Sequence, residues 1–258
     1  MKVFLGEVIH PEAVALLQRS AEIIKPRDNS RAAFLESLRE VDGIIARKIE
    51  VRAEEMDHAP RLKVIARHGV GLDTVDIEEA TKRGILVTYT PGANRVSVAE
   101  LAVALMLSLA RRIPQAQAAI RSIPQGDPTQ FYAVVKRFNL TGSDLEGKAL
   151  GIIGTGRIGS LVARKCVAAF EMSVKGYDPY VSAEVMNALG VKKVERLEDL
   201  LPTIDLLTVH CPLTRETKGM VGKRELALMK RGAYVINAAR GGIVNEKALY
   251  EALSEGHI

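Results

Sequence analysis

The chain has 258 residues, 47% of them hydrophobic and none of them tryptophan, which is enough for one large domain or two small ones with aliphatic cores. Its formal net charge is +5, but the basic residues are scattered among acidic ones, which argues against nucleic-acid binding and favours a small anionic ligand. The longest apolar run, residues 101–110, is too short to cross a bilayer, and the two cysteines, which lack metal-ligand spacing, indicate reduced thiols in a cytoplasmic protein.

Short apolar runs alternate with helix-forming segments in the first part of the chain. Strands are predicted at residues 3–5, 23–24, 43–46, 62–66 and 85–87, and helices at residues 11–19, 31–39, 52–58 and 77–83. Because strands that alternate with helices pair in parallel, we expect this part of the chain to form an α/β unit. It precedes the glycine-rich motif described below, so we expect a separate domain at residues 1–97.

Basic residues follow two of these predicted strands. Arg47 and Lys48 come directly after the third strand, and Arg67 follows the fourth, just before a glycine-containing turn. Since ligands of parallel sheets lie beyond the carboxyl ends of the strands, we interpret these residues as the rim of an anion-binding site. Solvated surface charge is the alternative explanation.

The next segment is expected to join two domains. Ser97 and Glu100 have the spacing of a capping box, which predicts a helix over residues 101–110. The helix is apolar on most faces, so we expect it to be buried at the domain junction. Residues 114–143 contain prolines and a glycine and show little periodicity, which predicts an irregular arm, with a dimer contact as one use.

A glycine-rich turn follows the apolar run at residues 149–153. Gly154, Gly156 and Gly159 fit the pattern G-x-G-x-x-G, and a predicted helix over residues 160–169 follows. In dinucleotide-binding proteins the first glycine makes the tight turn, the second lets the backbone approach a pyrophosphate, and the third lets the helix pack on the strand. The unpaired N–H groups at the helix start would bind the phosphates. A glycine turn without a ligand is the alternative.

An acidic residue stands where this motif requires one. The apolar segment at residues 172–177 ends at Asp178, nineteen residues past Gly159 (178 − 159). A carboxylate there accepts hydrogen bonds from the ribose hydroxyls of a dinucleotide and would repel the 2′-phosphate of NADP. The sequence therefore predicts a Rossmann domain that prefers NAD.

The remaining residues continue the alternation of strands and helices. Strands are predicted at residues 205–209 and 233–237, and helices at residues 182–189, 197–201, 225–229 and 246–254, the last capped by Asn245. Arg240 follows the last strand and is expected to face the ligand crevice at its carboxyl end. We expect this second domain to cover residues 98–258.

Several motifs, in this order, resemble one family. They are ARHGVGLDTVD from Ala66, TPGANRVSVAE from Thr90, LGIIGTGRIG from Leu150, the Tyr177-Asp178-Pro179 step, VHCPLT from Val209 and NAARGGIVNEKAL from Asn237. From about Gly43 onward the sequence resembles the D-isomer-specific 2-hydroxyacid dehydrogenases, and it looks nearest to their phosphoglycerate dehydrogenase branch.

The resemblance implies two doubly wound parallel-sheet domains with a cleft between them. These are a flavodoxin-like substrate domain and a Rossmann nucleotide domain, the latter without its last strand. The implied reaction transfers a hydride between NAD and a small anionic D-2-hydroxy acid, with a 3-phosphoglycerate-like acid as one case, and the implied assembly is a homodimer. A non-catalytic NAD-binding regulator of the corepressor type is the alternative, because the same fold serves both roles.

The resemblance also implies roles for individual residues. Arg240 matches the catalytic arginine of the family, whose guanidinium holds the substrate carboxylate and polarises the C2 carbonyl. The substrate would be bound by Arg47, Arg67 and the backbone amides of Val70 and Gly71. The implied cofactor contacts are Gly154, Gly156, Arg157, Ile158, Gly159, Asp178, Cys211, Ala238, Ala239 and Val70.

One departure from the family pattern concerns the proton donor. The family's catalytic histidine and its partner glutamate, the last strand and the helix that returns to the first domain would all lie beyond Ile258. His68, His210 and His257 do not match the catalytic position, and His210 is expected to shape a loop beside the cofactor. We therefore expect a C-terminally truncated form with little activity.

Overall fold

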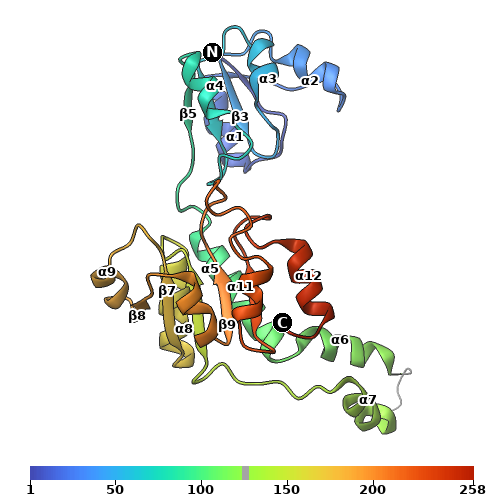
Figure 1. The fold of residues 1–258 in the computed structure, drawn as a ribbon. Helices are drawn as coiled ribbons and strands as arrows, with labels where there is room; N and C mark the ends of the chain where they lie inside the picture. The colour runs from blue at the N-terminus through green and yellow to red at the C-terminus, as the bar shows by residue number, and fades with distance from the viewer. Residues whose placement is uncertain (124–127) are drawn as a thin grey trace. The chain divides into compact units, whose positions relative to one another are not determined.

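The computed structural model describes residues 1–123 and 128–258 of the chain. The chain divides into two compact units, Met1–Asn94 and Arg95–Ile258, and each contains a five-stranded parallel sheet (Figure 1). The division falls three residues before the boundary at residue 97 that we expected from the sequence (97 − 94).

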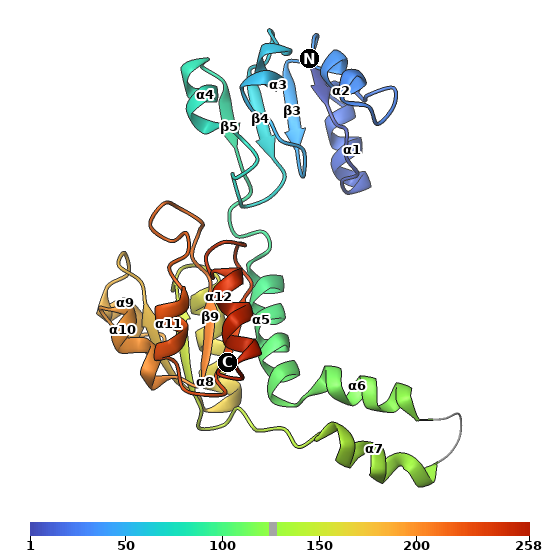
Figure 2. The same ribbon diagram turned by 45° about the vertical axis from the view of Figure 1, so that its right-hand side comes forward.

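The first unit has the strand order β2-β1-β3-β4-β5, of which β3, β4 and β5 can be followed in Figure 2. Its strands are β1 (Lys2–Phe4), β2 (Glu22–Ile24), β3 (Gly43–Ala46), β4 (Val64–Arg67) and β5 (Leu86–Thr88), and its helices are α1 (Pro11–Gln18), α2 (Arg31–Ser37), α3 (Ala53–Asp57) and α4 (Ile77–Lys82). This is the flavodoxin-like order, in which the direction of winding reverses between β1 and β3. The sequence-based prediction of that fold is confirmed.

The registers of the first sheet bring the ends of its central strands together. Val3 pairs with Gly43, and Ala46 pairs with Arg67, so β1, β3 and β4 end at the same edge. Phe4, Ile44 and Ile65, all almost fully buried, form the core beneath that edge. The loops that follow these strands are therefore held on a rigid base.

The second unit has the strand order β10-β9-β6-β7-β8. Its strands are β6 (Ala149–Ile153), β7 (Ser173–Tyr177), β8 (Val191–Lys193), β9 (Leu206–Val209) and β10 (Tyr234–Asn237), and the helices that accompany them are α8 (Gly159–Phe170), α9 (Ala183–Asn187), α10 (Leu197–Leu200), the 3₁₀-helix η2 (Leu201–Thr203), α11 (Lys223–Leu228) and α12 (Glu246–Ser254). The first strand of the unit is central, its second and third strands lie on one side, and its fourth and fifth lie on the other. This is the Rossmann arrangement, as predicted.

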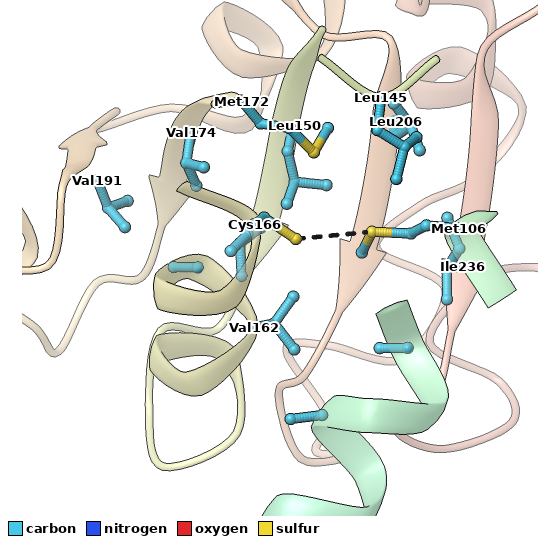
Figure 3. Close-up of a cluster of buried hydrophobic side chains, with 14 of the residues drawn as sticks. Met106, Leu145, Leu150, Val162, Cys166, Met172, Val174, Val191, Leu206 and Ile236 are labelled. Carbon is cyan, nitrogen blue, oxygen red and sulfur yellow. Dashed lines mark hydrogen bonds between the residues drawn. The ribbon is translucent and has the colours of Figure 1, made fainter. Parts of the chain in front are cut away.

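Alternate residues of the second sheet enter two different cores. Leu150 and Ile152 of β6 pack on one face, whereas Ile153 packs on the other. On the first face, Met106 of α5 (Arg95–Ala110) meets Cys166 of α8, with 4.0 Å between Sδ and Sγ (Figure 3). β6 and the glycine-containing turn that follows it are thus packed on both faces of the sheet.

Two sequence-based expectations about α5 were wrong, and one short strand was missed. The helix after the first unit begins at Arg95 and not after a capping box, because Ser97 and Glu100 lie inside α5. Its apolar character does not lead to burial on most faces, since the side chains of Leu101, Leu105 and Leu109 are exposed. A short strand, β8, was missed because two of its three residues are lysines.

The segment 114–143, expected to be irregular, is largely helical. It contains most of α6 (Ile113–Ser122), the 3₁₀-helix η1 (Pro128–Gln130) and α7 (Phe131–Phe138), and α6 and α7 lie side by side (Figure 2). Pro114 occupies the first turn of α6, where proline is tolerated. The prolines and glycine that suggested irregularity are at helix ends or in residues 124–127, outside the described part of the chain.

Candidate functional site

The three glycines after β6 have different surroundings. Gly154 has φ of +85°, and a Cβ there would lie 2.8 Å from the backbone nitrogen of Cys211, so both its conformation and its neighbours require glycine. A Cβ on Gly159 would lie 2.0 Å from the carbonyl oxygen of Gly154. A Cβ on Gly156 would meet nothing within 4 Å. Gly154 and Gly159 therefore pack the turn against its neighbours, and open space remains at Gly156.

The start of α8 lies beside that space, although the N–H groups of Ser160 and Leu161 there already donate to the carbonyls of Gly156 and Ile158. Ile158 occupies the N-cap position of this helix and makes no side-chain capping hydrogen bond. The first N–H groups of a helix have no partner within the helix and carry partial positive charge. Arg157, which is exposed, immediately precedes Ile158. The arrangement suits the pyrophosphate of a dinucleotide.

Asp178 lies at the end of β7 and is buried, with 9% of its surface exposed. Its Oδ2 accepts hydrogen bonds from the backbone N–H of Thr155 (2.9 Å) and from the Thr155 hydroxyl (3.4 Å), and its Oδ1 accepts one from the N–H of Tyr180 (2.9 Å). These contacts tie the carboxylate to the glycine turn. A carboxylate has about four acceptor positions, so one or more of them is left for ribose hydroxyls.

A hollow of about 230 Å³ brings four of the predicted cofactor residues together. Gly154, Gly156, Asp178 and Cys211 all line it. Its other lining residues are Ile153, Tyr177, Pro179, Tyr180, His210, Pro212, Thr214, Glu216, Thr217 and Met220. The hollow thus spans the carboxyl ends of β6, β7 and β9, where sheets of this topology bind ligands.

His210 and Cys211 follow β9 and line the hollow. Burial lowers the pKa of His210 to about 4, and its Nε2 lies 2.9 Å from the Thr208 hydroxyl. The buried Nδ1 atom of His210 has no hydrogen-bond partner among the described residues. Burial, followed by the negative charge of Asp178, raises the pKa of the Cys211 thiol. Both groups are therefore neutral near physiological pH.

Arg240 follows β10 in an exposed turn that Asn237 holds in shape. The Asn237 side chain accepts a hydrogen bond from the Ala239 N–H (3.1 Å) and donates one to the Arg240 carbonyl (2.8 Å). The Arg240 guanidinium donates to the Ala239 carbonyl at 3.0 Å. Asn237 is thus a positioning residue that sequence reasoning missed, although it directly precedes the predicted turn.

The other predicted cofactor residues do not line this hollow. Ile158 and Ala238 pack against the core on one face of the sheet, and Ala239 packs against the core on the other. Val70 belongs to the first unit, together with Gly71, Arg47 and Arg67. Their assignment to ligand binding stays a prediction.

In the first unit, Arg67 has a role that the sequence did not reveal. Its Nε donates to the Gly71 carbonyl (2.8 Å), and its Nη1 donates to the carbonyls of His68 (2.8 Å) and Ala46 (3.2 Å). These bonds occupy part of the guanidinium and connect the loops after β3 and β4. Arg67 therefore shapes the backbone around Val70 and Gly71, whereas Arg47 is more exposed.

A larger hollow of about 660 Å³ lies elsewhere in the first unit. It is bordered by Arg31 and Arg52, among other residues. Arg31 pairs with Glu54 and Glu55, and Arg52 pairs with Glu50, so its charges are already compensated. We assign no ligand to it, because its arginines are occupied by neighbouring carboxylates.

Residues 1–123 and 128–258 also bear on metal binding and on membrane insertion. No cluster of three or more His, Cys, Asp or Glu side chains in these ranges has the arrangement of a metal site. Within the same ranges, no helix combines the length and apolar character needed to span a membrane.

A family model and the sequences of known relatives assign the chain to the same family. A family model described as "D-isomer specific 2-hydroxyacid dehydrogenase, NAD binding domain" matches residues 103–258. The chain is 40% identical along its whole length to D-3-phosphoglycerate dehydrogenase of Methanocaldococcus jannaschii, of which it covers 47%. It is also 40% identical along its whole length to glyoxylate reductase of Thermococcus litoralis, of which it covers 77%.

A solved structure gives the same result. The D-lactate dehydrogenase from Aquifex aeolicus, complexed with NAD and lactic acid, matches with a TM-score of 0.82 at 32% identity, covering all of this chain and 74% of that one. The chain spans about half the length of the phosphoglycerate dehydrogenases it matches, as the 47% coverage shows.

Proposed function

Because the chain belongs to the D-isomer specific 2-hydroxyacid dehydrogenase family, we propose that it is an oxidoreductase that transfers a hydride between NAD and a small anionic D-2-hydroxy acid. The observation that carries this proposal is the hollow beyond β6, β7 and β9. There the open space at Gly156, the uncapped start of α8 and the carboxylate of Asp178 occur together.

These residues fit a dinucleotide. The N–H groups at the start of α8 would bind the pyrophosphate, and Gly156 has no Cβ to obstruct it. Asp178 would accept hydrogen bonds from the ribose hydroxyls and disfavour a 2′-phosphate. When bound, the nicotinamide ring supplies the hydride acceptor or donor. NAD is named in the matched family model and in the D-lactate dehydrogenase complex.

The substrate would be held by its negative charges. Arg240, whose turn is braced by Asn237, would bind the carboxylate and stabilise the negative charge that develops on the C2 oxygen during reduction. In the first unit, the Val70 and Gly71 amides and the side chains of Arg47 and Lys48 would bind further anionic groups. A phosphorylated acid, as in the 3-phosphoglycerate of one relative's name, fits this excess of cations.

We also propose that the functional form is a homodimer. The leucines at positions 101, 105 and 109 recur every four residues and so form one exposed stripe on α5. Exposed apolar residues also occur on the neighbouring helices, at Ile113 of α6 and Phe131 of α7. A second copy of the chain would bury this surface.

The direct test is turnover by the gene product that contains this chain. We expect NAD-dependent oxidation of at least one acid among D-lactate, D-glycerate and 3-phosphoglycerate, followed by NADH absorbance. An Arg240→Gln variant should lose most of the rate, about 10²-fold or more, whereas Arg231→Gln, an exposed change after α11, should not. NAD binding without oxidation of any acid would instead support the non-catalytic alternative.

A further inference from the structure

Three successive backbone amides after β3 converge on one carboxylate oxygen. Glu7 Oε2 accepts hydrogen bonds from the N–H groups of Arg47 (2.9 Å), Lys48 (2.7 Å) and Ile49 (3.3 Å). Consecutive amides arranged in this way form an anion-binding concavity. Here the anion belongs to the chain itself, so the loop 47–49 is fixed in place by an internal ligand.

The topology explains why Glu7 can reach this loop. β1 and β3 are hydrogen-bonded neighbours, with Phe4 paired to Ile44, so their carboxyl ends leave the sheet side by side. The contact is reciprocal, because Arg47 Nη1 donates to the carbonyl of Val8 at 3.3 Å. The loops on either side of the topological switch between β1 and β3 are therefore joined, at the position where flavodoxin-like sheets bind ligands.

The cationic side chains of this loop remain exposed. Arg47 and Lys48 are both accessible to solvent, and the Arg47 side chain donates to a backbone carbonyl, that of Val8. Because the amides are already occupied, an incoming anion would meet the guanidinium and ammonium groups instead. Their direction depends on the loop backbone, and the loop backbone depends on Glu7.

We infer that Glu7 is a positioning residue for an anionic group of the substrate. By holding the amides of residues 47–49, it fixes the loop from which Arg47 and Lys48 project. The inference rests on the proposed function, because it takes these two cations as part of the substrate site. It adds the residue that orients them, which itself carries the opposite charge and so is not expected to touch the substrate.

An electrostatic role and a positioning role of Glu7 predict opposite effects of Glu7→Gln on the affinity for anions. Removing a negative charge beside Arg47 and Lys48 should tighten anion binding if only electrostatics matters. Loss of the charge-assisted hydrogen bonds should loosen the loop and weaken anion binding if Glu7 positions it. Glu7→Asp separates the two effects again, because it keeps the charge and shortens the reach. Glu78→Gln is the matched control, since Glu78 is an exposed acid of the same unit.

The experiment titrates inorganic phosphate into the full 258-residue chain and its variants, followed by amide resonances and calorimetry. We expect Glu7→Gln and Glu7→Asp to weaken phosphate binding by about tenfold, because small misplacements of binding groups are costly. Affinity for NAD and the melting temperature should change little. Amide protons of residues 47–49 should exchange slowly with solvent in the wild type and faster in Glu7→Gln. This hydrogen-exchange measurement needs no ligand.

Several results would overturn the inference. Unchanged or tighter phosphate binding in Glu7→Gln would show that Glu7 acts only through charge or not at all. A parallel loss of phosphate and NAD binding would contradict a role confined to the loop 47–49. A wild-type chain that binds no phosphate would also contradict it. Failure of the proposed function would look different, as absent NAD binding or absent acid oxidation in the wild type itself.

Discussion

At the residue scale, Asp178 is both a part of the turn and a candidate selector of the cofactor. Its carboxylate is hydrogen-bonded to Thr155 and Tyr180 and faces the hollow. We expect the wild type to bind NAD more tightly than NADP. Asp178→Asn should weaken NAD binding about tenfold and bring the affinities for NAD and NADP closer together. Calorimetric titration of both cofactors measures this. Asp199→Asn, an exposed change in α10, is the control, and tighter NADP binding by the wild type would contradict the prediction.

His210 should make the stability of the protein depend on pH. Its pKa is lowered by burial from 6.5 to about 4, so the unfolded chain takes up a proton at a higher pH than the folded chain does. The stability from the neutral ring is fully present above the unfolded pKa and is lost as pH falls toward the folded one. Between about pH 7 and about pH 5 we expect a loss on the order of 2 kcal/mol, measured by urea unfolding.

The matching variant is His210→Gln, which cannot titrate in this range. It should remove that part of the pH dependence, whereas His68→Gln, at an exposed histidine of the first unit, should leave it in place. The same slope in the wild type and in His210→Gln would show that the buried ring is not its source.

The two cysteines should differ in reactivity. Cys166 is fully buried between α5 and α8, and burial raises its pKa to about 11, so little thiolate exists near neutral pH. Cys211 is only partly buried and lines the hollow. We expect iodoacetamide to label Cys211 slowly and Cys166 hardly at all, and NAD to protect Cys211, as followed by mass spectrometry. Equal labelling of both in the folded chain would be inconsistent with this structure.

At the element scale, the glycine turn offers a matched pair of substitutions. A methyl group on Gly159 would lie 2.0 Å from the Gly154 carbonyl, so Gly159→Ala should destabilise the second unit by about 1–3 kcal/mol. A methyl group on Gly156 meets nothing, so Gly156→Ala should fold normally and lose about tenfold or more in NAD affinity. Thermal unfolding and calorimetry separate the two. Normal NAD binding by Gly156→Ala would show that the pyrophosphate does not bind in this space.

The same elements show how far sequence patterns determine structure. β6 and α12 have the predicted bounds, because a continuous apolar run and the cap at Asn245 are strong local signals. The start of α5 and the helices α6 and α7 were not predicted. The helical spacing of Phe131, Val134, Val135 and Phe138 in α7 was overlooked, and proline was taken as a breaker although it fits a first helical turn.

The candidate site was predictable to the extent that it is encoded by contiguous motifs. Gly154, Gly156, Asp178 and Cys211 were identified from the sequence and share one hollow, whereas Arg157, Ile158 and Gly159 do not line it. The bracing contacts were not, because they connect residues far apart in the chain, such as Glu7 to the loop at 47–49. Arg67 was recognised as a cation, but its bonds to three carbonyls depend on the packing of β3 beside β4.

At the scale of the whole molecule, the remaining question is assembly. The side chains of Leu101, Leu105 and Leu109 on α5 are 52%, 39% and 39% exposed, and their spacing places them on one face. Burial of such a stripe contributes roughly 25 cal/mol per Å² of apolar surface, which makes it a strong candidate for contact with a second copy. We therefore expect the wild-type chain to be a dimer at micromolar concentration by light scattering.

The variant that tests this assembly is Leu105→Lys, in the middle of the stripe. A lysine there would place a charge in the interface and should convert the dimer to a monomer without unfolding it, because the wild-type side chain is already partly exposed. Leu253→Lys on α12, at a leucine 53% exposed, is the matched control and should leave the dimer intact. A wild-type monomer, or a Leu105→Lys dimer as stable as the wild type, would show that this face of α5 is not where two copies meet.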